Sequence, residues 1–91
     1  MTPDQFAQAL QSDGFDPAVT VTREPGGGLD EHTHPYEVRA LILAGDIGIA
    51  VAGEERVYRP GDVFHLPAHT PHREWYGAEG VQYLAGRRPV G

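Results

Sequence analysis

The chain has 91 residues, a formal net charge of −6 and no cysteine. This length allows one domain, the acidic balance disfavours binding to nucleic-acid phosphates, and the lack of cysteine excludes disulfides and sulfur-based zinc sites. The first residues lack the pattern of a signal peptide, and the longest apolar stretch is interrupted by Arg39 and Asp46 and is too short to cross a bilayer. We therefore expect a single cytoplasmic domain, residues 1–91, that binds neither nucleic acid nor a membrane.

The only predicted helix covers residues 3–12. Thr2 can cap its first turn, Pro3 suits the first helical position, and Gln5 completes a weak capping box. Apolar residues then recur at helical spacing as far as Leu10. A single helix of this length is not stable alone, so we expect it to pack against a sheet.

The rest of the chain predicts an all-β fold. Twelve glycines and eight prolines are spread along the sequence and mark frequent tight turns. Residues 25–28 are expected to form a flexible loop, and Gly45-Asp46 to join two strands. Seven short strands of this kind are typical of a β-sandwich or a small barrel. The predicted strands cover residues 18–24, 37–44, 47–52, 55–58, 63–66, 72–76 and 81–86.

The predicted strand 37–44 is apolar on both faces. Ala40 and Ile42 would lie on one face, and Leu41 and Leu43 on the other. A strand in a half-exposed sheet is polar on its outer face, so the second apolar face must be covered. Either the N-terminal helix or a second subunit would cover it, and we expect a homodimer contact there.

Two histidines, His32 and His34, lie in the segment LDEHTHPYEV at residues 29–38. Side chains two positions apart on a strand point the same way, so both imidazoles can bind one divalent metal ion. The alternative is a polar loop in which two histidines are close by chance. A His-x-His pattern alone does not decide between the two, so a further ligand from elsewhere in the chain would be informative.

The segment RPGDVFHLPAHTPH, residues 59–72, supplies such a ligand. This segment resembles the second of the two motifs of the cupin superfamily, and the segment with His32 and His34 resembles the first. The resemblance extends over about residues 19–86. The matching residues of the first motif are Gly26 to Gly28, His32, His34 and Gly45, and those of the second are Pro60, Gly61, Asp62, Pro67 and His72.

This resemblance implies a small single-domain cupin. Its fold would be a double-stranded β-helix, or jelly-roll, barrel at about residues 19–86 with one short helix before it. The resemblance also implies that His32, His34 and His72 converge on one divalent transition metal, namely Fe, Mn, Ni, Cu or Zn. Three neutral imidazoles leave coordination positions open for water or a substrate.

The fourth ligand of the family, a glutamate, has no direct counterpart. Counting back from Gly45 places it at Val38, and the acid present, Glu37, lies one residue earlier. In an unbroken strand Glu37 faces away from the histidines, although Pro35 can break the register and bring it round. Two alternatives stay open. Either Glu37 completes the site, or the site has three histidines, as in cysteine dioxygenase and the diketone-cleaving cupins, and Glu37 pairs with an arginine at the surface.

Further candidates surround these ligands. His69 stands where many cupins have glycine, and would either donate a hydrogen bond beside the metal or lie in an exposed loop. His65 lies mid-strand on the face opposite its neighbours and is expected to point outward. Aromatic side chains would line a pocket for a small organic ligand or pack as core. They are Tyr36, Phe64, Trp75, Tyr76 and Tyr83.

Three functions are consistent with this interpretation. The first is a metal-dependent enzyme, oxygenase-like or isomerase-like, that acts on a small organic substrate. The second is a cupin that binds or senses a small molecule without turnover, and the third is a structural metal site in a dimeric accessory protein. Because one fold serves many functions, the motifs alone do not choose among them.

Overall fold

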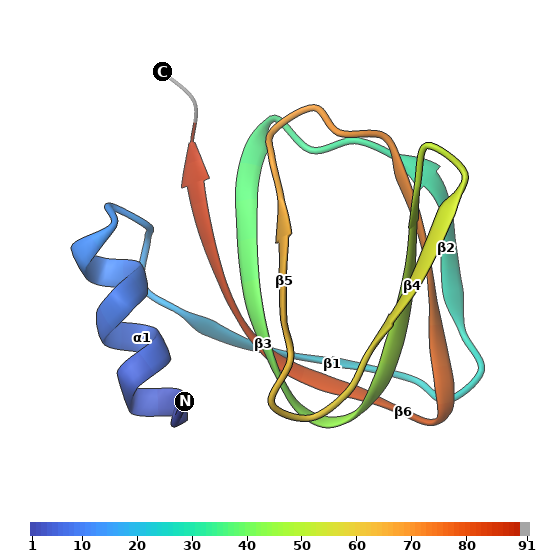
Figure 1. The fold of residues 1–91 in the computed structure, drawn as a ribbon, viewed down its shortest axis with the longest axis horizontal. Coiled ribbons are helices and arrows are strands. Elements are labelled where there is room, and N and C mark those ends of the chain that lie inside the picture. The colour runs from blue at the N-terminus through green and yellow to red at the C-terminus, as the bar shows by residue number, and fades with distance from the viewer. Residues whose placement is uncertain (90–91) are drawn as a thin grey trace.

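The computed structural model describes residues 1–89 (Figure 1). Its first element is the helix α1 (Pro3–Ser12). Six strands follow within the described range: β1 (Val19–Arg23), β2 (Gly28–His32), β3 (Tyr36–Val51), β4 (Glu54–Tyr58), β5 (Val63–Leu66) and β6 (His72–Pro89). None of the helical structure in residues 1–89 is long and apolar enough to cross a lipid bilayer.

Helix α1 begins and ends where the sequence predicts. The Thr2 hydroxyl accepts a hydrogen bond from the backbone N–H of Gln5 at 3.1 Å, and the side-chain oxygen of Gln5 accepts one from the N–H of Thr2 at 2.9 Å. Its buried residues are Phe6 and Leu10, which lie on one face. The capping box therefore sets the start of the helix, and its apolar face sets how it lies against the sheet.

Helix α1 covers the outer face of β3. Phe6, Leu10 and Phe15 form an apolar cluster with Leu41, and each of these side chains is at most 6% exposed. Gly86 of β6 makes room for the helix, because a Cβ there would lie 2.7 Å from a methyl group of Leu10. The helix therefore covers the second apolar face of this strand. A second subunit is not needed to bury Leu41, and the homodimer stays a prediction.

Strands β3 and β6 form the spine of the sheet. They run antiparallel, and the first half of each pairs with the second half of the other: 36–42 lies against 83–89, and 47–50 lies against 73–76. The shorter strands extend these two halves, with β1 and β2 added to β6, and β5 and β4 added to β3. The ribbon therefore curls round into the barrel seen in Figure 1, which confirms the predicted all-β cupin fold class.

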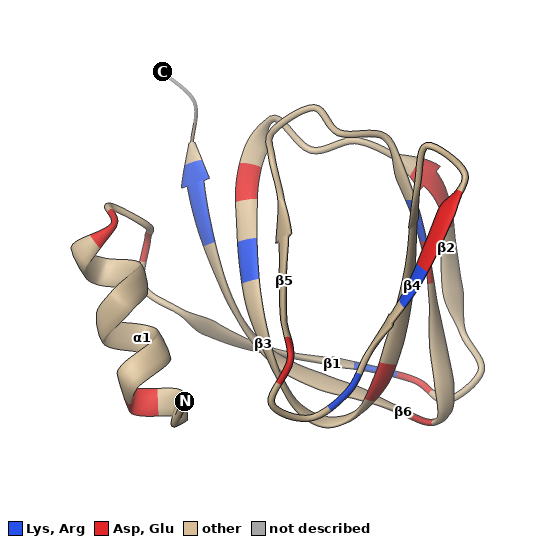
Figure 2. Ribbon diagram, viewed as in Figure 1, with Lys and Arg blue, Asp and Glu red and all other residues tan. Residues whose placement is uncertain are grey.

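The main core lies between the two halves of this curled sheet. Alternate residues of β3 and β6 point into it, as expected for strands that have one face buried. Its buried members are Ala40, Ile42, Ile47, Ile49, Phe64, Leu66, Tyr76, Val81, Tyr83 and Ala85. Acidic and basic residues are spread along the chain, with acidic ones on α1 and both kinds on the strands (Figure 2).

The two strands predicted on either side of Gly45 are one continuous strand. Gly45 has a φ of +70°, and the register with β6 shifts on both sides of it. A bulge of this kind bends a strand without ending it. The predicted turn at Gly45-Asp46 is therefore a bend inside β3. Residues 77–80 are likewise part of β6, where the sequence predicts a connection between two strands.

Strand β2 overlaps the end of the loop predicted at residues 25–28. Its side chains are mostly exposed, so it has no alternating apolar pattern from which to predict it. Gly28 pairs with Trp75 of β6, and a Cβ at Gly28 would lie 2.7 Å from the carbonyl oxygen of Glu74. The strand conformation therefore depends on close pairing with β6, which a glycine permits.

We predict that Gly45→Ala lowers the free energy of unfolding by about 3–4 kcal/mol, because it adds left-handed backbone strain to a steric clash. A Cβ at Gly45 would lie 2.0 Å from the carbonyl oxygen of Gly80. The matched control is Gly53→Ala, which has a φ of +83° but no atom within 4 Å of the added Cβ, and should cost only about 1 kcal/mol. Urea unfolding of both variants measures the difference, and equal losses would contradict the role of Gly45 in the bend.

Candidate metal centre

Three histidines from the two predicted segments meet at one end of the barrel. His32 ends β2, His34 precedes β3, and His72 begins β6. His32 and His72 are direct partners on neighbouring strands, with ring centroids 4.2 Å apart. The centroid of the His34 ring lies 4.8 Å from that of His32 and 5.2 Å from that of His72. One ring nitrogen of each histidine lies within 4.8 Å of the other two.

Backbone carbonyls orient two of the three rings. The Nδ1 atom of His32 lies 2.7 Å from the carbonyl oxygen of Asp30, and that of His72 lies 2.9 Å from the carbonyl oxygen of Thr70. A carbonyl only accepts hydrogen bonds, so each ring donates its Nδ1–H and keeps a free lone pair on Nε2. Metal-binding histidines commonly have this arrangement, because the donated hydrogen bond fixes the tautomer and the ring orientation.

The donor atoms of the cluster fit a divalent transition metal. The Nε2 atom of His32 is buried and has no hydrogen-bond partner among residues 1–89, which is unfavourable unless another group satisfies it. Burial lowers the pKa of His34, and the charges of His32, His72 and Arg87 lower it further. A lowered pKa favours the neutral imidazole, which is the form that binds a metal.

His34 is held from two sides. The Tyr36 ring stacks on it with centroids 5.0 Å apart and an interplanar angle of 15°, and the Tyr36 hydroxyl lies 3.3 Å from Nδ1 of His34. The backbone N–H of His69 donates to the carbonyl oxygen of His34 at 2.8 Å. His69 itself has a φ of +63° and is exposed, so it contacts the site through its backbone. A left-handed conformation also explains why glycine would suit this position.

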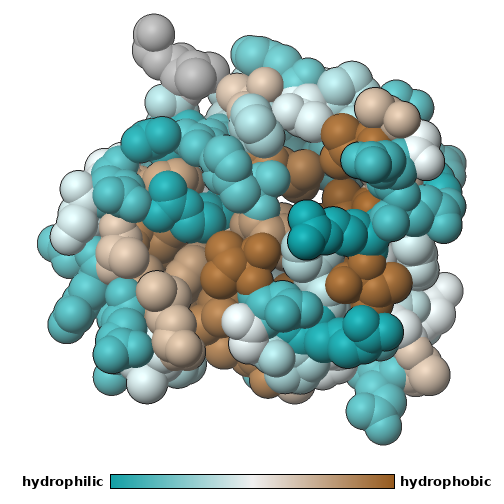
Figure 3. Space-filling model, in the orientation of Figure 1, coloured by the Kyte–Doolittle hydropathy of each residue, from teal (hydrophilic) through white to brown (hydrophobic). Residues whose placement is uncertain are grey.

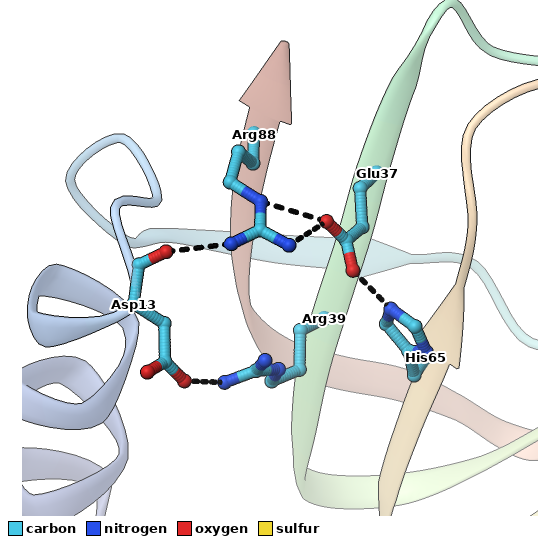
Figure 4. Close-up of polar contacts among 5 residues, drawn as sticks. All are labelled: Asp13, Glu37, Arg39, His65 and Arg88. Atoms are coloured by element: carbon cyan, nitrogen blue, oxygen red, sulfur yellow. Dashed lines mark hydrogen bonds and ion pairs between the residues drawn. The ribbon is translucent and has the colours of Figure 1, made fainter. Parts of the chain in front are cut away.

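Glu37 lies outside the histidine cluster, on the outer face of β3 (Figure 4). Its carboxylate accepts hydrogen bonds from His65 and, at 2.8 Å, from Nε of Arg88. Arg88 also donates to the carbonyl oxygen of Asp13 at 2.7 Å, and Arg39 pairs with the Asp13 carboxylate. Because β3 keeps its alternation here, Glu37 and Arg39 both face outward. This network connects β3, β5 and β6 to the end of α1, and Glu37 does not complete the cluster.

The Glu37 network should make stability depend on pH. The hydrogen bond from His65 lowers the pKa of Glu37 below its ordinary value of 4.5, against the opposing effect of burial, and Arg88 lowers it further. A carboxyl group with a depressed folded-state pKa contributes stability above its unfolded pKa, and this contribution is lost as the pH falls through the folded value. We expect the stability difference between wild type and Glu37→Gln to be largest near neutral pH and to shrink below about pH 4.5.

Urea unfolding of both proteins between pH 7 and pH 3 measures this difference. The control is Glu55→Gln, which removes an exposed pair with Arg73 and should change stability little at any pH. A difference between wild type and Glu37→Gln that stays constant over this range would contradict the prediction.

A cavity of about 80 Å³ adjoins the histidines. Tyr36, Phe64 and Tyr83 line it, Phe64 and Tyr83 also belong to the buried core, and His34 and His72 form part of its wall. Trp75 does not line it. It lies three positions from the inward-facing His72, so its side chain points outward. Its indole lies over the outer side of Gly48, where an added Cβ would be 2.0 Å from the ring.

Three charged residues in the cavity lining were not predicted, namely Arg23, Glu74 and Arg87. Glu74 is only 8% exposed, and its Oε1 accepts a hydrogen bond from the Tyr76 hydroxyl at 3.2 Å. Burial, together with the charge of Glu74, raises the pKa of Tyr76 to about 12. His72, Glu74 and Tyr76 follow one another at intervals of two along the strand. The inward direction of His72 would therefore have indicated that Glu74 and Tyr76 also point inward.

A larger cleft of about 460 Å³ opens between β4 and β5, which do not pair with each other. Phe64 and Leu66 line both this cleft and the smaller cavity, so they form the wall between the two. Figure 3 faces this side of the molecule and shows apolar side chains between hydrophilic ones. His65 lies at the edge of the cleft and outside the histidine cluster, as expected from the alternation in β5.

The fold is similar to several solved structures. The structure of KdgF from Halomonas sp. is 25% identical with a TM-score of 0.71, and the match covers 82% of this chain and 69% of that one. DMSP lyase DddQ from Ruegeria pomeroyi DSS-3 is 29% identical with a TM-score of 0.70, over 79% of this chain but only 37% of that one. An RmlC-like cupin from Shewanella frigidimarina NCIMB 400 has 23% identity and a TM-score of 0.70, over 81% of this chain and 66% of that one, and shows the fold alone.

A comparison with curated proteins found no match. The family model of the cupin domain, however, matches residues 19–84. This range holds all three clustered histidines. The sequence resemblance, the barrel and this match agree, and the chain belongs to the cupin family.

Proposed function

We propose that the chain binds one divalent transition metal at His32, His34 and His72 and acts on a small organic molecule beside it. The observation that carries this proposal is the buried Nε2 of His32, which lacks a partner in residues 1–89 and lies among two further imidazoles. Histidine donors suit Fe, Mn, Ni, Cu or Zn, and three of them leave positions open for ligand atoms. Such a cation would polarise an oxygen atom of the ligand.

Glu74 favours an enzyme over a protein that only binds its ligand. Its carboxylate lies on the inward row of β6, one inward position beyond His72, and lines the same cavity. The Tyr76 hydroxyl holds one carboxylate oxygen in place. Glu74 is thus placed to accept a proton from a ligand in the cavity, as isomerase-type and lyase-type reactions require. The similarity to a chain named as a lyase, DMSP lyase DddQ, supports this class of reaction.

An oxygenase is the second candidate. The ligand cluster in residues 1–89 consists of three histidines without a carboxylate, which is the donor set expected of oxygenase-type cupins such as cysteine dioxygenase. The two candidates differ in what they consume, since an oxygenase requires dioxygen and a proton-transfer enzyme does not. A protein that binds a ligand without turnover would show neither activity.

We predict that His72→Ala abolishes metal uptake. His72 is 3% exposed and donates its Nδ1–H away from the cluster, so its Nε2 is free to bind an ion. In wild type, zinc at about 1,000 times its dissociation constant should add about 4 kcal/mol to the free energy of unfolding. Metal content and zinc-dependent thermal unfolding measure both effects in protein without a histidine tag.

His65→Ala is the matched control, because this exposed histidine lies outside the cluster and the variant should retain full uptake. Should His72→Ala fold poorly, His72→Gln removes the ligand with less change in side-chain volume. Unchanged metal content in a folded His72 variant would contradict the proposed site.

We predict that Glu74→Gln lowers turnover by about 100-fold or more while leaving metal content unchanged, because the proton acceptor is lost and the imidazoles remain. Metal-loaded protein is incubated in D₂O with a panel of small ketones, aldehydes and hydroxy acids, and deuterium incorporation is followed by NMR. Oxygen consumption is recorded on the same panel. Oxygen consumption without deuterium exchange would favour the oxygenase, and neither activity would favour a binding protein.

A further inference from the structure

Arg87 occupies an inward position on β6. The buried core residues Val81, Tyr83 and Ala85 precede it at intervals of two, and Arg87 is the direct partner of Val38 on β3. Alternate residues of a strand share a face, so Arg87 continues this row, but it is exposed and therefore lies at the rim of the barrel. It lines the cavity next to the histidines, close to the C-terminal end of β6, where β6 pairs with the start of β3.

The guanidinium group of Arg87 is held close to the histidine cluster. Its central carbon lies 4.7 Å from the centre of the Tyr36 ring, and that ring stacks in turn on His34. The guanidinium carries five N–H donors, and its position over the ring is compatible with donation to an acceptor in the cavity. The neighbouring Arg88 pairs with Glu37 on the outer face, whereas no ion pair within residues 1–89 involves Arg87.

Glu74 provides a hydrogen-bond acceptor deeper in the same cavity. One of its oxygens accepts from Tyr76, and the other has no hydrogen-bond partner in the described part of the chain. The residue is mostly buried, but this oxygen stays accessible and can accept a hydrogen bond from an O–H group of a ligand. Between Arg87 and Glu74 the wall is apolar, with Val38, Leu66 and Ala85.

We propose that the ligand of this site is a small hydroxy acid with a single carboxylate. Its carboxylate binds Arg87 at the mouth of the cavity, and its hydroxyl group donates to Glu74. This inference rests on the proposed function, since it names the substrate class of the same site. The cavity of about 80 Å³ limits the ligand to a few carbon atoms. A second negative charge on the ligand would be repelled by Glu74.

The test compares the binding of lactate and 3-hydroxypropanoate with that of their amides, which lack the charge. Affinities for zinc-loaded and metal-free protein are measured by NMR titration, after metal content has been determined. We expect the acids to bind wild type at least about 10-fold more tightly than the amides, and Arg87→Gln to remove most of this preference. Arg88→Gln, the adjacent residue on the opposite face, is the matched control and should leave it unchanged.

The Arg87 variant separates two sources of a preference for acids. A preference due to direct binding of the carboxylate to zinc survives Arg87→Gln, whereas one due to the guanidinium does not. Propanoate lacks the hydroxyl group of lactate. We therefore expect the ratio of the lactate affinity to the propanoate affinity to fall about 10-fold in Glu74→Gln compared with wild type.

Equal binding of acids and amides by wild type, or an unchanged preference in Arg87→Gln, would overturn the inference while leaving the metal site intact. Failure of wild type to take up metal would instead overturn the proposed function, and the metal analysis shows this before any acid is added.

Discussion

The crossed pairing of β3 with β6 is the constraint on which the rest of the structure depends. Because each strand bends near its middle, one pair of strands contributes to both halves of the barrel and gives every shorter strand its neighbour. The bend requires Gly45 in a left-handed conformation with its backbone close to Gly80. Pairing of β2 with the first half of β6 then places His32 directly opposite His72.

The sequence predicted those features that depend on local patterns or on a familiar motif. The helix follows from its capping residues, and the three histidines follow from two motifs with a characteristic order. The bend at Gly45 could not be predicted, since a glycine followed by aspartate suits a turn and a bulge equally well, and only pairing with β6 decides between them. Strand β2 was missed for a related reason, because its exposed residues carry no apolar alternation.

The charged residues of the cavity show where alternation helps and where it fails. Alternation indicated an outward Glu37 but left open whether Pro35 brings it round to the histidines. Its partners His65 and Arg88 come from strands distant in sequence and could not be predicted from alternation. Glu74 was within reach, since it lies two residues beyond His72 in the same strand. Arg87 was not, because the predicted strand ended at residue 86 and the row of inward residues was cut short.

The hydrogen bond from the His69 N–H to the His34 carbonyl joins the two histidine-bearing segments through backbone atoms alone. With the strand pairing of His32 and His72, it holds the histidine-bearing segments together through contacts between backbone atoms. Preorganisation of this kind spares an incoming cation the conformational entropy of gathering three chain segments. A cation bound here would therefore meet ligands whose chain segments are held by backbone hydrogen bonds, in contrast to small zinc domains that fold only around their metal.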